Sequence, residues 1–437
     1  MISMYSEGKI TRKKATETLS LSERQVTRMR KEYERLGDES MIHKNSGRTP
    51  SNALCLPLKE RVIEIYGLTE YEGVNHTHFK EILLSDYDID ISYTSLCRIL
   101  KSSGNESPLK KRQPVRRKKR KRKEHPGELI QVDASPFEWL GGNQKYSLHG
   151  AIDDATGEIV GLYLANNECL FGYFEIMRQC IEDFGVPQSL YSDMHAIFRS
   201  PKTDKLSVEE LINGKTVNLT QFGRAMYELG IDIISAKSPQ AKGRIEKLWA
   251  TLQGRLPVEF RKRGITNTAD ANLFLLEYRS HFAKLFAVKP EADPMYVPFP
   301  SKASLDHFLC IKHERKVDNT CVFSFANRAF KIDTKGYPLI SKGSTVMVHI
   351  SPRVGIKAEY LGNVYDAVRF IKPDTKKYST VTKPQRKRAN KTLPQNQFKE
   401  NLNVWRDLWV DGERELDIQF LNDLFFSDAH RHTKRYG

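Results

Sequence analysis

The chain of 437 residues carries 70 lysines and arginines against 54 aspartates and glutamates, a formal net charge of +16 at pH 7. This length permits about two to four domains with hydrophobic cores, and the basic excess favours a polyanionic partner, most commonly nucleic acid. The six cysteines lack CxxC or CxxH spacing, and no apolar run is long enough to cross a bilayer. These absences argue against a zinc site, a disulfide framework and a membrane partner, and predict a soluble cytoplasmic protein.

The first predicted element is a helix, a tight turn and a second helix. Ser22 followed by Gln25 is the pattern of a capping box, apolar residues follow at helical spacing, and Gly37 is a natural stop. Only six residues precede Glu7 and Gly8, so a helix before them is expected to be very short; either the start is truncated or that helix is vestigial.

The second of these helices offers side chains suited to phosphates and base edges, as a DNA recognition helix requires. The candidates are Arg24, Gln25, Thr27, Arg28 and Lys31. A purely structural helical hairpin is the alternative interpretation.

A second helical unit is predicted between Pro57 and about Leu100, as three short amphipathic patterns. Ser92 is the expected N-cap of the last helix, and Arg98 is its candidate DNA contact. The signal for DNA binding is weaker here than in the first unit.

A basic linker follows, in which eleven of the fourteen residues from Lys110 to Lys123 are Lys or Arg. Such a block repels itself, stays extended and is ordered by a polyanion. Its candidate DNA contacts are Arg116, Arg117, Lys118, Lys119 and Arg120. A second basic stretch runs from Lys376 to Lys391.

The middle of the chain predicts an α/β domain with the element order β-β-β-α-β-α-β-α. Asp133 lies on its first strand, Asp193 ends the fourth, and Glu246 begins the helix after the fifth. Strand ends and helix N-termini meet at one edge of such a sheet, where active sites form. Asp153 and Asp154 are competing carboxylates, but a paired Asp before Ala-Thr-Gly is more typical of a turn.

The segment around Glu246 reads "SPQAKGRIEKLWATLQ" and predicts an amphipathic helix. Its polar and basic residues are candidates for holding a DNA backbone: Gln240, Lys242, Arg244, Lys247 and Arg255. Taken alone, Glu246 could instead be a solvated surface residue paired with Lys242.

Residues 321–370 alternate in polarity with regular Gly, Asn and Pro, which predicts about five short strands in a small SH3-like β-barrel. This domain could bind DNA or bridge subunits, or it could serve only for packing. Further on, Trp405 and Trp409 could anchor the tail on a partner subunit.

Three motifs in order carry a family resemblance: "QVDAS" at Asp133, "YSDMHAIF" at Asp193, and "SPQAKGRIEKLWATLQ" at Glu246. The region from about 124 to 300 resembles the retroviral-integrase-type catalytic core with an RNase H-like fold. The whole chain resembles the ISNCY group of bacterial insertion-sequence transposases. Two departures are the long interval between the second and third carboxylates and Met194, where relatives commonly have Asn or Arg. They leave the roles of His195 and of an insertion at 199–218 open.

The resemblance implies a DDE transposase that binds the terminal inverted repeats of its element and joins them to target double-stranded DNA. Asp133, Asp193 and Glu246 would be both catalytic residues and ligands of two Mg²⁺ ions about 3.5–4 Å apart, with Mn²⁺ as a substitute. It also implies a homodimer or larger homo-oligomer on DNA, in the nucleoid of a bacterial cytoplasm. An RNase H-like nuclease without strand transfer and a non-catalytic DNA-binding regulator are the alternatives.

The predicted fold is therefore multidomain, with N-terminal all-α helix-turn-helix units, a central α/β RNase H-like core and a small C-terminal SH3-like β-barrel. The expected boundaries are 1–50 for the helix-turn-helix domain, 51–108 for a second helical, winged or helix-turn-helix-like DNA-binding domain, 109–123 for the basic linker, 124–305 for the catalytic core, 306–371 for the barrel and 372–437 for a basic linker and tail.

Overall fold

The computed structural model describes residues 1–42, 54–108, 120–193, 197–198, 219–235, 242–300, 304–325, 328–334 and 340–370. Residues 1–65 and the residues from 66 onward form two separate compact units. None of the helices in these described ranges combines the length and the apolar composition that a bilayer-spanning segment needs.

The N-terminal unit begins with three helices, α1 (Ile2–Ser6), α2 (Arg12–Leu19) and α3 (Glu23–Leu36), followed by the 3-10 helix η1 (Gly37–Met41). The first helix is as short as expected. The predicted capping box at Ser22 is confirmed, because Ser22 and Gln25 bond to each other's backbone amides. Ile2, Ala15 and Val26 form the small buried core of the three helices.

The next elements in chain order, called the second helical group below, are α4 (Leu56–Tyr66), which ends the first compact unit, and η2 (Thr69–Tyr71), α5 (His76–Tyr87) and α6 (Tyr93–Ser102), which belong to the second. The three predicted helical patterns are confirmed, as is Ser92, whose hydroxyl accepts a hydrogen bond from the Ser95 amide. Asn75 caps α5 in the same way by accepting from the amide of His78.

The central domain has the predicted element order around a five-stranded sheet. Its strands are β1 (Ile130–Phe137), β2 (Tyr146–Asp153), β3 (Ile159–Ala165), β4 (Ser189–Ser192) and β5 (Asp232–Ser235), and its helices are α7 (Leu170–Asp183), α9 (Gln221–Glu228), α10 (Gly243–Gln253), α11 (Leu256–Lys262) and α12 (Thr268–Phe286). The spatial order is β3-β2-β1-β4-β5. The first three strands pair antiparallel, whereas β4 pairs parallel with both β1 and β5.

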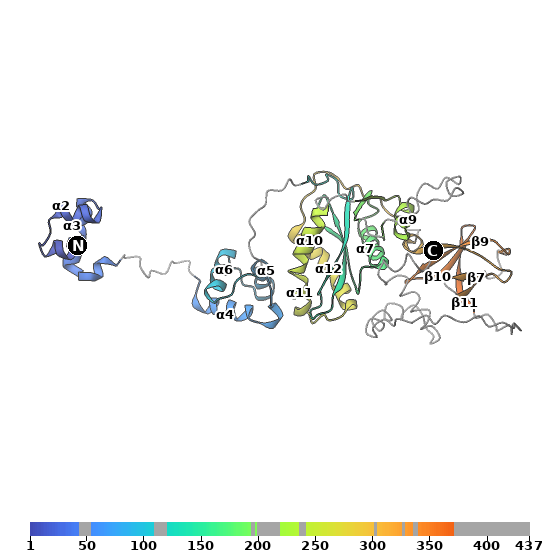
Figure 1. Ribbon diagram of the computed structural model, residues 1–437, viewed down its shortest axis with the longest axis horizontal. Helices are drawn as coiled ribbons and strands as arrows, with labels where there is room; N and C mark the ends of the chain where they lie inside the picture. The colour runs from blue at the N-terminus through green and yellow to red at the C-terminus, as the bar shows by residue number, and fades with distance from the viewer. Residues whose placement is uncertain are drawn as a thin grey trace, which may run out of the picture. The chain divides into compact units, whose positions relative to one another are not determined.

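Helices cover both faces of this sheet, with α7 on one side and α10–α12 on the other (Figure 1). Successive side chains of a strand point to opposite faces of the sheet, so each strand contributes to the hydrophobic core on both sides. On β1, Ile130 and Val132 pack in the α7 layer, while on β2 Leu148 and Ile152 pack with Trp249 of α10. Asp133 follows Val132 and consequently faces the α10 side.

The C-terminal part contains the short helix α13 (Leu305–Phe308) and a six-stranded antiparallel sheet in the order β6-β9-β10-β11-β8-β7. Its strands are β6 (Ile311–Lys316), β7 (Val322–Phe325), β8 (Arg328–Ile332), β9 (Thr345–Ser351), β10 (Gly355–Tyr360) and β11 (Asn363–Phe370). The five strands expected within 321–370 are present. The sequence interpretation missed β6, whose closeness to β7 curves the sheet toward closure.

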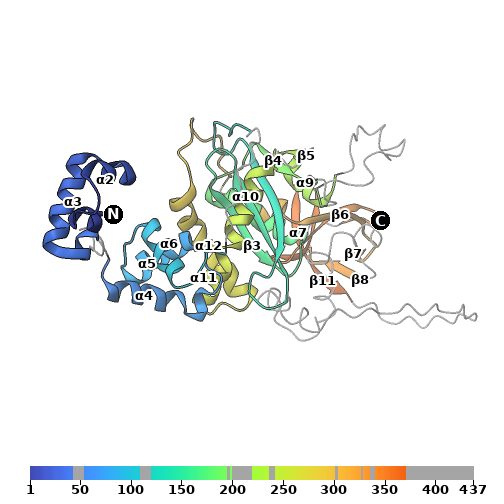
Figure 2. The ribbon, with the colours of Figure 1, turned by 60° about the vertical axis from the view of Figure 1, so that its left-hand side comes forward.

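This curved sheet lies against α7 and α9 of the central domain (Figure 2). The Arg353 guanidinium donates twice to the Glu175 carboxylate of α7, at 2.9 and 2.6 Å. The Gln221 side chain of α9 both donates to and accepts from the backbone of Lys312 on β6. The two domains therefore share polar contacts as well as an apolar core.

Candidate active site

Strand pairing brings Asp133 and Asp193 together. The parallel register of β1 and β4 matches Ile130 with Leu190 and Gln131 with Tyr191. Two further residues along both strands place Asp133 opposite Asp193, which directly follows β4. The Asp133 side chain is 22% exposed and that of Asp193 is 45% exposed, so the pair opens toward solvent.

The ammonium group of Lys242 lies between these carboxylates. Its Nζ is 2.8 Å from Oδ1 of Asp133 and 4.0 Å from Oδ2 of Asp193. Its side chain is only 10% exposed, unusually low for a lysine. The sequence predicts that Lys242 contacts DNA. In this structure its ammonium group lies against two of the three candidate carboxylates, Asp133 and Asp193, where a positive charge is stabilised.

The structure does not bring the carboxylates of Asp133, Asp193 and Glu246 all within 4.8 Å of one another, but Glu246 lies on the helix whose neighbouring side chains contact Asp133. Lys242 precedes it by four residues and Trp249 follows it by three, so all three share one side of the helix. Both neighbours reach Asp133, since the Trp249 indole Nε1 donates to Oδ2 at 3.0 Å. Glu246 itself is exposed in the first turn of α10, where the helix dipole favours a carboxylate.

The Trp249 ring occupies space that a glycine leaves open. Gly150 is the cross-strand partner of Asp133, and a Cβ at this position would lie 2.5 Å from the Trp249 ring. Because Gly150 has no side chain, the indole can occupy this space while its Nε1 donates to the Asp133 carboxylate. Sequence reasoning assigned Trp249 to the apolar face alone and did not single out Gly150.

A buried polar network holds the start of α10 against β1. The Gln131 side chain accepts from the Ile245 amide at 3.2 Å and donates to the Asp154 carboxylate at 2.7 Å. Asp154 is fully buried and also binds Arg120 and, at 2.7 Å, the Nε of Arg244. Because Gln131 is two residues from Asp133, this network fixes both the acidic strand and the helix that carries Glu246.

This network changes the interpretation of two candidate DNA contacts. Arg120 and Arg244 point their guanidinium groups at Asp154. The turn expected at Asp153 and Asp154 is confirmed, because Asp153 accepts hydrogen bonds from the amides of Ala155 and Thr156. Neither aspartate belongs to the open carboxylate pair.

Arg255 is also engaged elsewhere. Its side chain is 6% exposed, donates to both carboxylate oxygens of Glu81 at 2.5 and 2.8 Å, and lies over the Phe286 ring. Arg255 therefore connects the central domain to α5. A second buried contact between the same elements joins His78 and Glu259 at 2.7 Å. We accordingly leave Arg255 out of the proposed DNA surface.

The other candidate contacts divide into exposed residues and residues outside the described ranges. Arg24, Gln25, Arg28, Lys31, Arg98 and Lys247 are exposed, and Thr27 is half-buried. The carbonyl oxygen of the Gln25 side chain is already used in the capping box. Outside the described residues lie Arg116, Arg117, Lys118, Lys119, Met194, His195, Gln240, Trp405, Trp409 and the segment 199–218.

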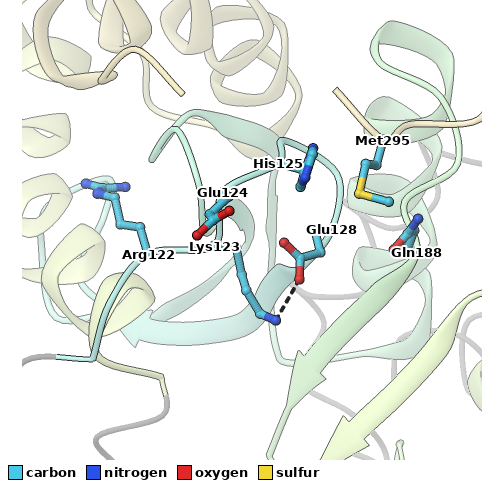
Figure 3. A pocket seen from close by; sticks show the side chains of 7 residues that line it. All are labelled: Arg122, Lys123, Glu124, His125, Glu128, Gln188 and Met295. Atoms are coloured by element: carbon cyan, nitrogen blue, oxygen red, sulfur yellow. Dashed lines mark hydrogen bonds and ion pairs between the residues drawn. The ribbon is translucent and has the colours of Figure 1, made fainter. Parts of the chain in front are cut away.

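A separate open pocket does not include any of the three carboxylates. It is lined by Arg122, Lys123, Glu124, His125, Glu128, Gln188 and Met295 (Figure 3). The Lys123 ammonium is paired with Glu128 at 2.7 Å, and the His125 ring contacts the backbone oxygen of Asp293. These charges satisfy one another, so the pocket offers no comparable reactive group.

Two curated proteins resemble the chain over most of its length. The transposase for insertion sequence IS1202 of Streptococcus pneumoniae is 33% identical over 363 residues, which cover 76% of each chain. A putative transposase of Sinorhizobium fredii is 32% identical over 336 residues, covering 76% of this chain and 71% of the relative. No family model matches the chain.

Solved structures give weaker likenesses. A chain of the simian T-cell lymphotropic virus intasome in complex with PP2A regulatory subunit B56 gamma has a TM-score of 0.30 and 15% identity, covering 72% of this chain and all of that one. The HTLV-2 integrase catalytic core domain in complex with magnesium has a TM-score of 0.25 and 17% identity, covering 35% of this chain and 85% of that one. We draw no argument from scores this low.

Proposed function

The chain belongs to the insertion-sequence transposases, enzymes that cleave and join DNA, and we propose that Asp133, Asp193 and Glu246 are its catalytic carboxylates. The observation that carries this proposal is the Lys242 ammonium, held between Asp133 and Asp193 where a cation is stabilised. Glu246 would join them from the first turn of α10, the helix that carries Trp249. The direct test is whether neutralising any one carboxylate stops cleavage and strand transfer.

The three side chains fit hard divalent cations, which prefer carboxylate oxygens. Two Mg²⁺ ions, with Mn²⁺ as a substitute, would supply Lewis-acid stabilisation of an in-line displacement at a phosphodiester. Asp133, Asp193 and Glu246 would be the residues that hold these ions. Trp249 is a positioning residue, because its indole N–H fixes one oxygen of Asp133.

The substrate of this reaction is double-stranded DNA, both the terminal inverted repeats of the element and the target. The α2–turn–α3 unit would act as a helix-turn-helix that reads the ends, with the second helical group and the linker 109–123 on the flanking backbone. The central domain would be an RNase H-like core and the curved sheet an SH3-like barrel. A homodimer or larger assembly in the bacterial nucleoid would pair the two ends.

The position of Lys242 leads to a prediction about metal affinity. Replacing Lys242 with Met removes the ammonium that competes for Asp133 and Asp193, so the DNA-free protein should bind Mn²⁺ about tenfold more tightly. A tenfold change in affinity corresponds to about 1.4 kcal/mol, which is less than the ~4 kcal/mol interaction between two unit charges 4 Å apart near a protein surface. Electron paramagnetic resonance of free Mn²⁺ measures it directly.

The matched control for this measurement is Lys247→Met, an exposed lysine further along the same helix. It should leave Mn²⁺ affinity almost unchanged. Unchanged or weaker binding in the Lys242 variant would show that the lysine supports the metal site instead of competing with it.

A second prediction concerns α3. Replacing Arg24 and Arg28 with Ala should reduce binding to element ends by about 10- to 100-fold relative to random duplex, because each good base contact is worth roughly 1–3 kcal/mol of discrimination. Gln25 is left intact because its loss would also weaken the helix cap. Competition binding on both duplexes gives the ratio.

The control for this pair is Lys13→Ala with Arg35→Ala, which removes the same charge from exposed positions on α2 and α3. This variant should lose affinity equally on both DNAs, as phosphate contacts do. If the Arg24 and Arg28 variant behaves like the control, α3 contacts the backbone and does not read sequence.

A further inference from the structure

A second group of metal-ligating side chains lies away from the acidic triad, where α13 meets the curved sheet. Among the residues that the structure describes, His307, His349 and Glu359 are the one set of three whose ligand atoms all lie within 4.8 Å of one another. His307 comes from α13, His349 from β9 and Glu359 from β10. No sequence motif unites them, since they span more than fifty positions.

The distances within this group match the spacing of ligands around a small cation. Oε2 of Glu359 is 3.0 Å from Nε2 of His349 and 3.8 Å from Nε2 of His307. Bonds of about 2.0–2.1 Å in a tetrahedral zinc site place neighbouring ligand atoms roughly 3.3–3.4 Å apart. The two measured separations lie on either side of that value.

The orientation of His349 is the second, independent observation. The residue is 3% exposed, and its Nε2 has no hydrogen-bond partner although the Glu359 oxygen is 3.0 Å away. The two atoms are close, but their contact does not have the geometry of a hydrogen bond, so this nitrogen is left for another partner. A buried polar nitrogen without a partner is costly unless something binds it.

The surroundings keep the histidines in the form that binds metals. Burial lowers the pKa of His349 to about 3, and the positive charges of Lys312 and Arg224 act in the same direction. Burial likewise lowers the pKa of His307. Both rings are therefore neutral at physiological pH, and a neutral imidazole nitrogen is a zinc ligand.

Two lysines flank His349 across the sheet, and each is paired with a carboxylate, with Glu228 shared between Lys312 and Arg224. Lys312 and Lys357 are the cross-strand partners of His349 on β6 and β10. The Lys312 ammonium is 2.8 Å from Glu228, and that of Lys357 is 3.5 Å from Asp366. These pairings reduce the repulsion that a bound cation would meet.

We propose that His307, His349 and Glu359 bind a zinc ion, with a fourth position open to water. Two imidazoles and a carboxylate are a ligand set typical of zinc with one open position. The cysteine pattern could not reveal such a site, because none of its ligands is a cysteine. The site does not depend on the proposed roles of the acidic triad.

The ion would fasten the curved sheet to the central domain. α13 is already tied to α7, through Asp306 with Arg178 at 2.5 Å, and to α9, through Arg224 with the backbone oxygen of Phe308. Zinc between α13 and the strands β9 and β10 would add a coordinate link between these two bodies. The expected consequence is a metal-dependent rise in thermal stability of the full chain.

The test uses the full-length chain carrying Asp133→Asn, so that the acidic triad contributes less to metal binding. After chelation and desalting, Zn²⁺ is titrated in competition with a chromophoric chelator. We expect one zinc per chain, with an affinity at least about tenfold lower after Glu359→Gln or His307→Asn, since loss of a residue that only hydrogen-bonds a metal ligand already costs about 10–100-fold. His313→Asn, on the neighbouring strand β6 but outside the cluster, should bind like the parent.

Thermal melting gives a second readout. Zinc should raise the midpoint of the parent and of the His313 variant but not that of the Glu359 variant, which keeps its shape and loses only a charge. Absence of stoichiometric zinc in the parent, or equal affinity and equal stabilisation in all variants, would overturn the proposal and leave His349 and Glu359 as a buried polar contact.

Discussion

Asp133→Asn, Asp193→Asn and Glu246→Gln are each expected to abolish cleavage and joining of element ends while leaving end binding intact. Each change removes one negative charge and keeps the shape of the side chain. Asp133 should be the most sensitive, because one of its oxygens is fixed by Trp249 and the other is shared with the Lys242 ammonium. The expected loss is at least about a thousandfold, since metal-assisted charge stabilisation is worth several kcal/mol.

Strand transfer of a labelled end duplex into a plasmid, with Mg²⁺ or Mn²⁺, measures the reaction, and gel retardation measures end binding. Asp232→Asn is the matched control, because Asp232 is an exposed carboxylate on β5 of the same sheet. A triad variant with near-parental strand transfer would remove that residue from the catalytic set. Parental protein that hydrolyses ends but never joins them would favour the nuclease alternative.

The sequence predicted the three carboxylates because their signal is local. Asp133 lies within an alternating strand, Asp193 directly follows one, and Glu246 begins an amphipathic helix. Two neighbouring strands and a helix start therefore suffice to predict a candidate site before any tertiary contact is known. The helix caps were predictable for the same reason, since Ser22 and Ser92 each accept a hydrogen bond from the backbone amide three residues further on.

The partners of the basic residues were not predictable in this way. Lys242, Arg244 and Arg255 lie in one short segment of the sequence and look alike as phosphate ligands. In the structure they bind Asp133, Asp154 and Glu81, which lie 109, 90 and 174 positions away. Which carboxylate meets which cation depends on long-range packing, and the role of Gly150 beneath Trp249 depends on strand register.

Asp154→Ala is expected to have the opposite profile to the triad variants, with a large loss of stability and retained chemistry. The Asp154 carboxylate is fully buried, is hydrogen-bonded by the Gln131 side chain at 2.7 Å and the Lys123 amide at 2.9 Å, and is ion-paired with Arg120 and Arg244. Removing it leaves two guanidinium groups without their counter-charge and two N–H donors unpaired.

Losing one partner of a buried ion pair costs about 3–5 kcal/mol. We expect the lower end of this range for Asp154→Ala, because the Arg120 and Arg244 side chains keep 33% and 20% of their surface in water and can be partly solvated. Urea unfolding of the parent and the variant, followed by circular dichroism, measures the difference. Strand transfer at low temperature, where the variant is still folded, should stay within a few-fold of the parent.

The roles of Asp133 and Asp154 can then be distinguished by measuring both activity and stability for each variant. Asp133→Asn should be inactive and lose less stability than Asp154→Ala, because Asn keeps the side-chain shape and Asp193 remains near the Lys242 ammonium, whereas Asp154→Ala should be unstable and active when folded. Asp154 lies beside β1 yet inside the protein, so a metal ligand there would have no route to DNA. A folded but inactive Asp154 variant would mean that the network through Gln131 positions Asp133 closely enough for its loss to stop the reaction, and Asp154 would then join the positioning residues of the site.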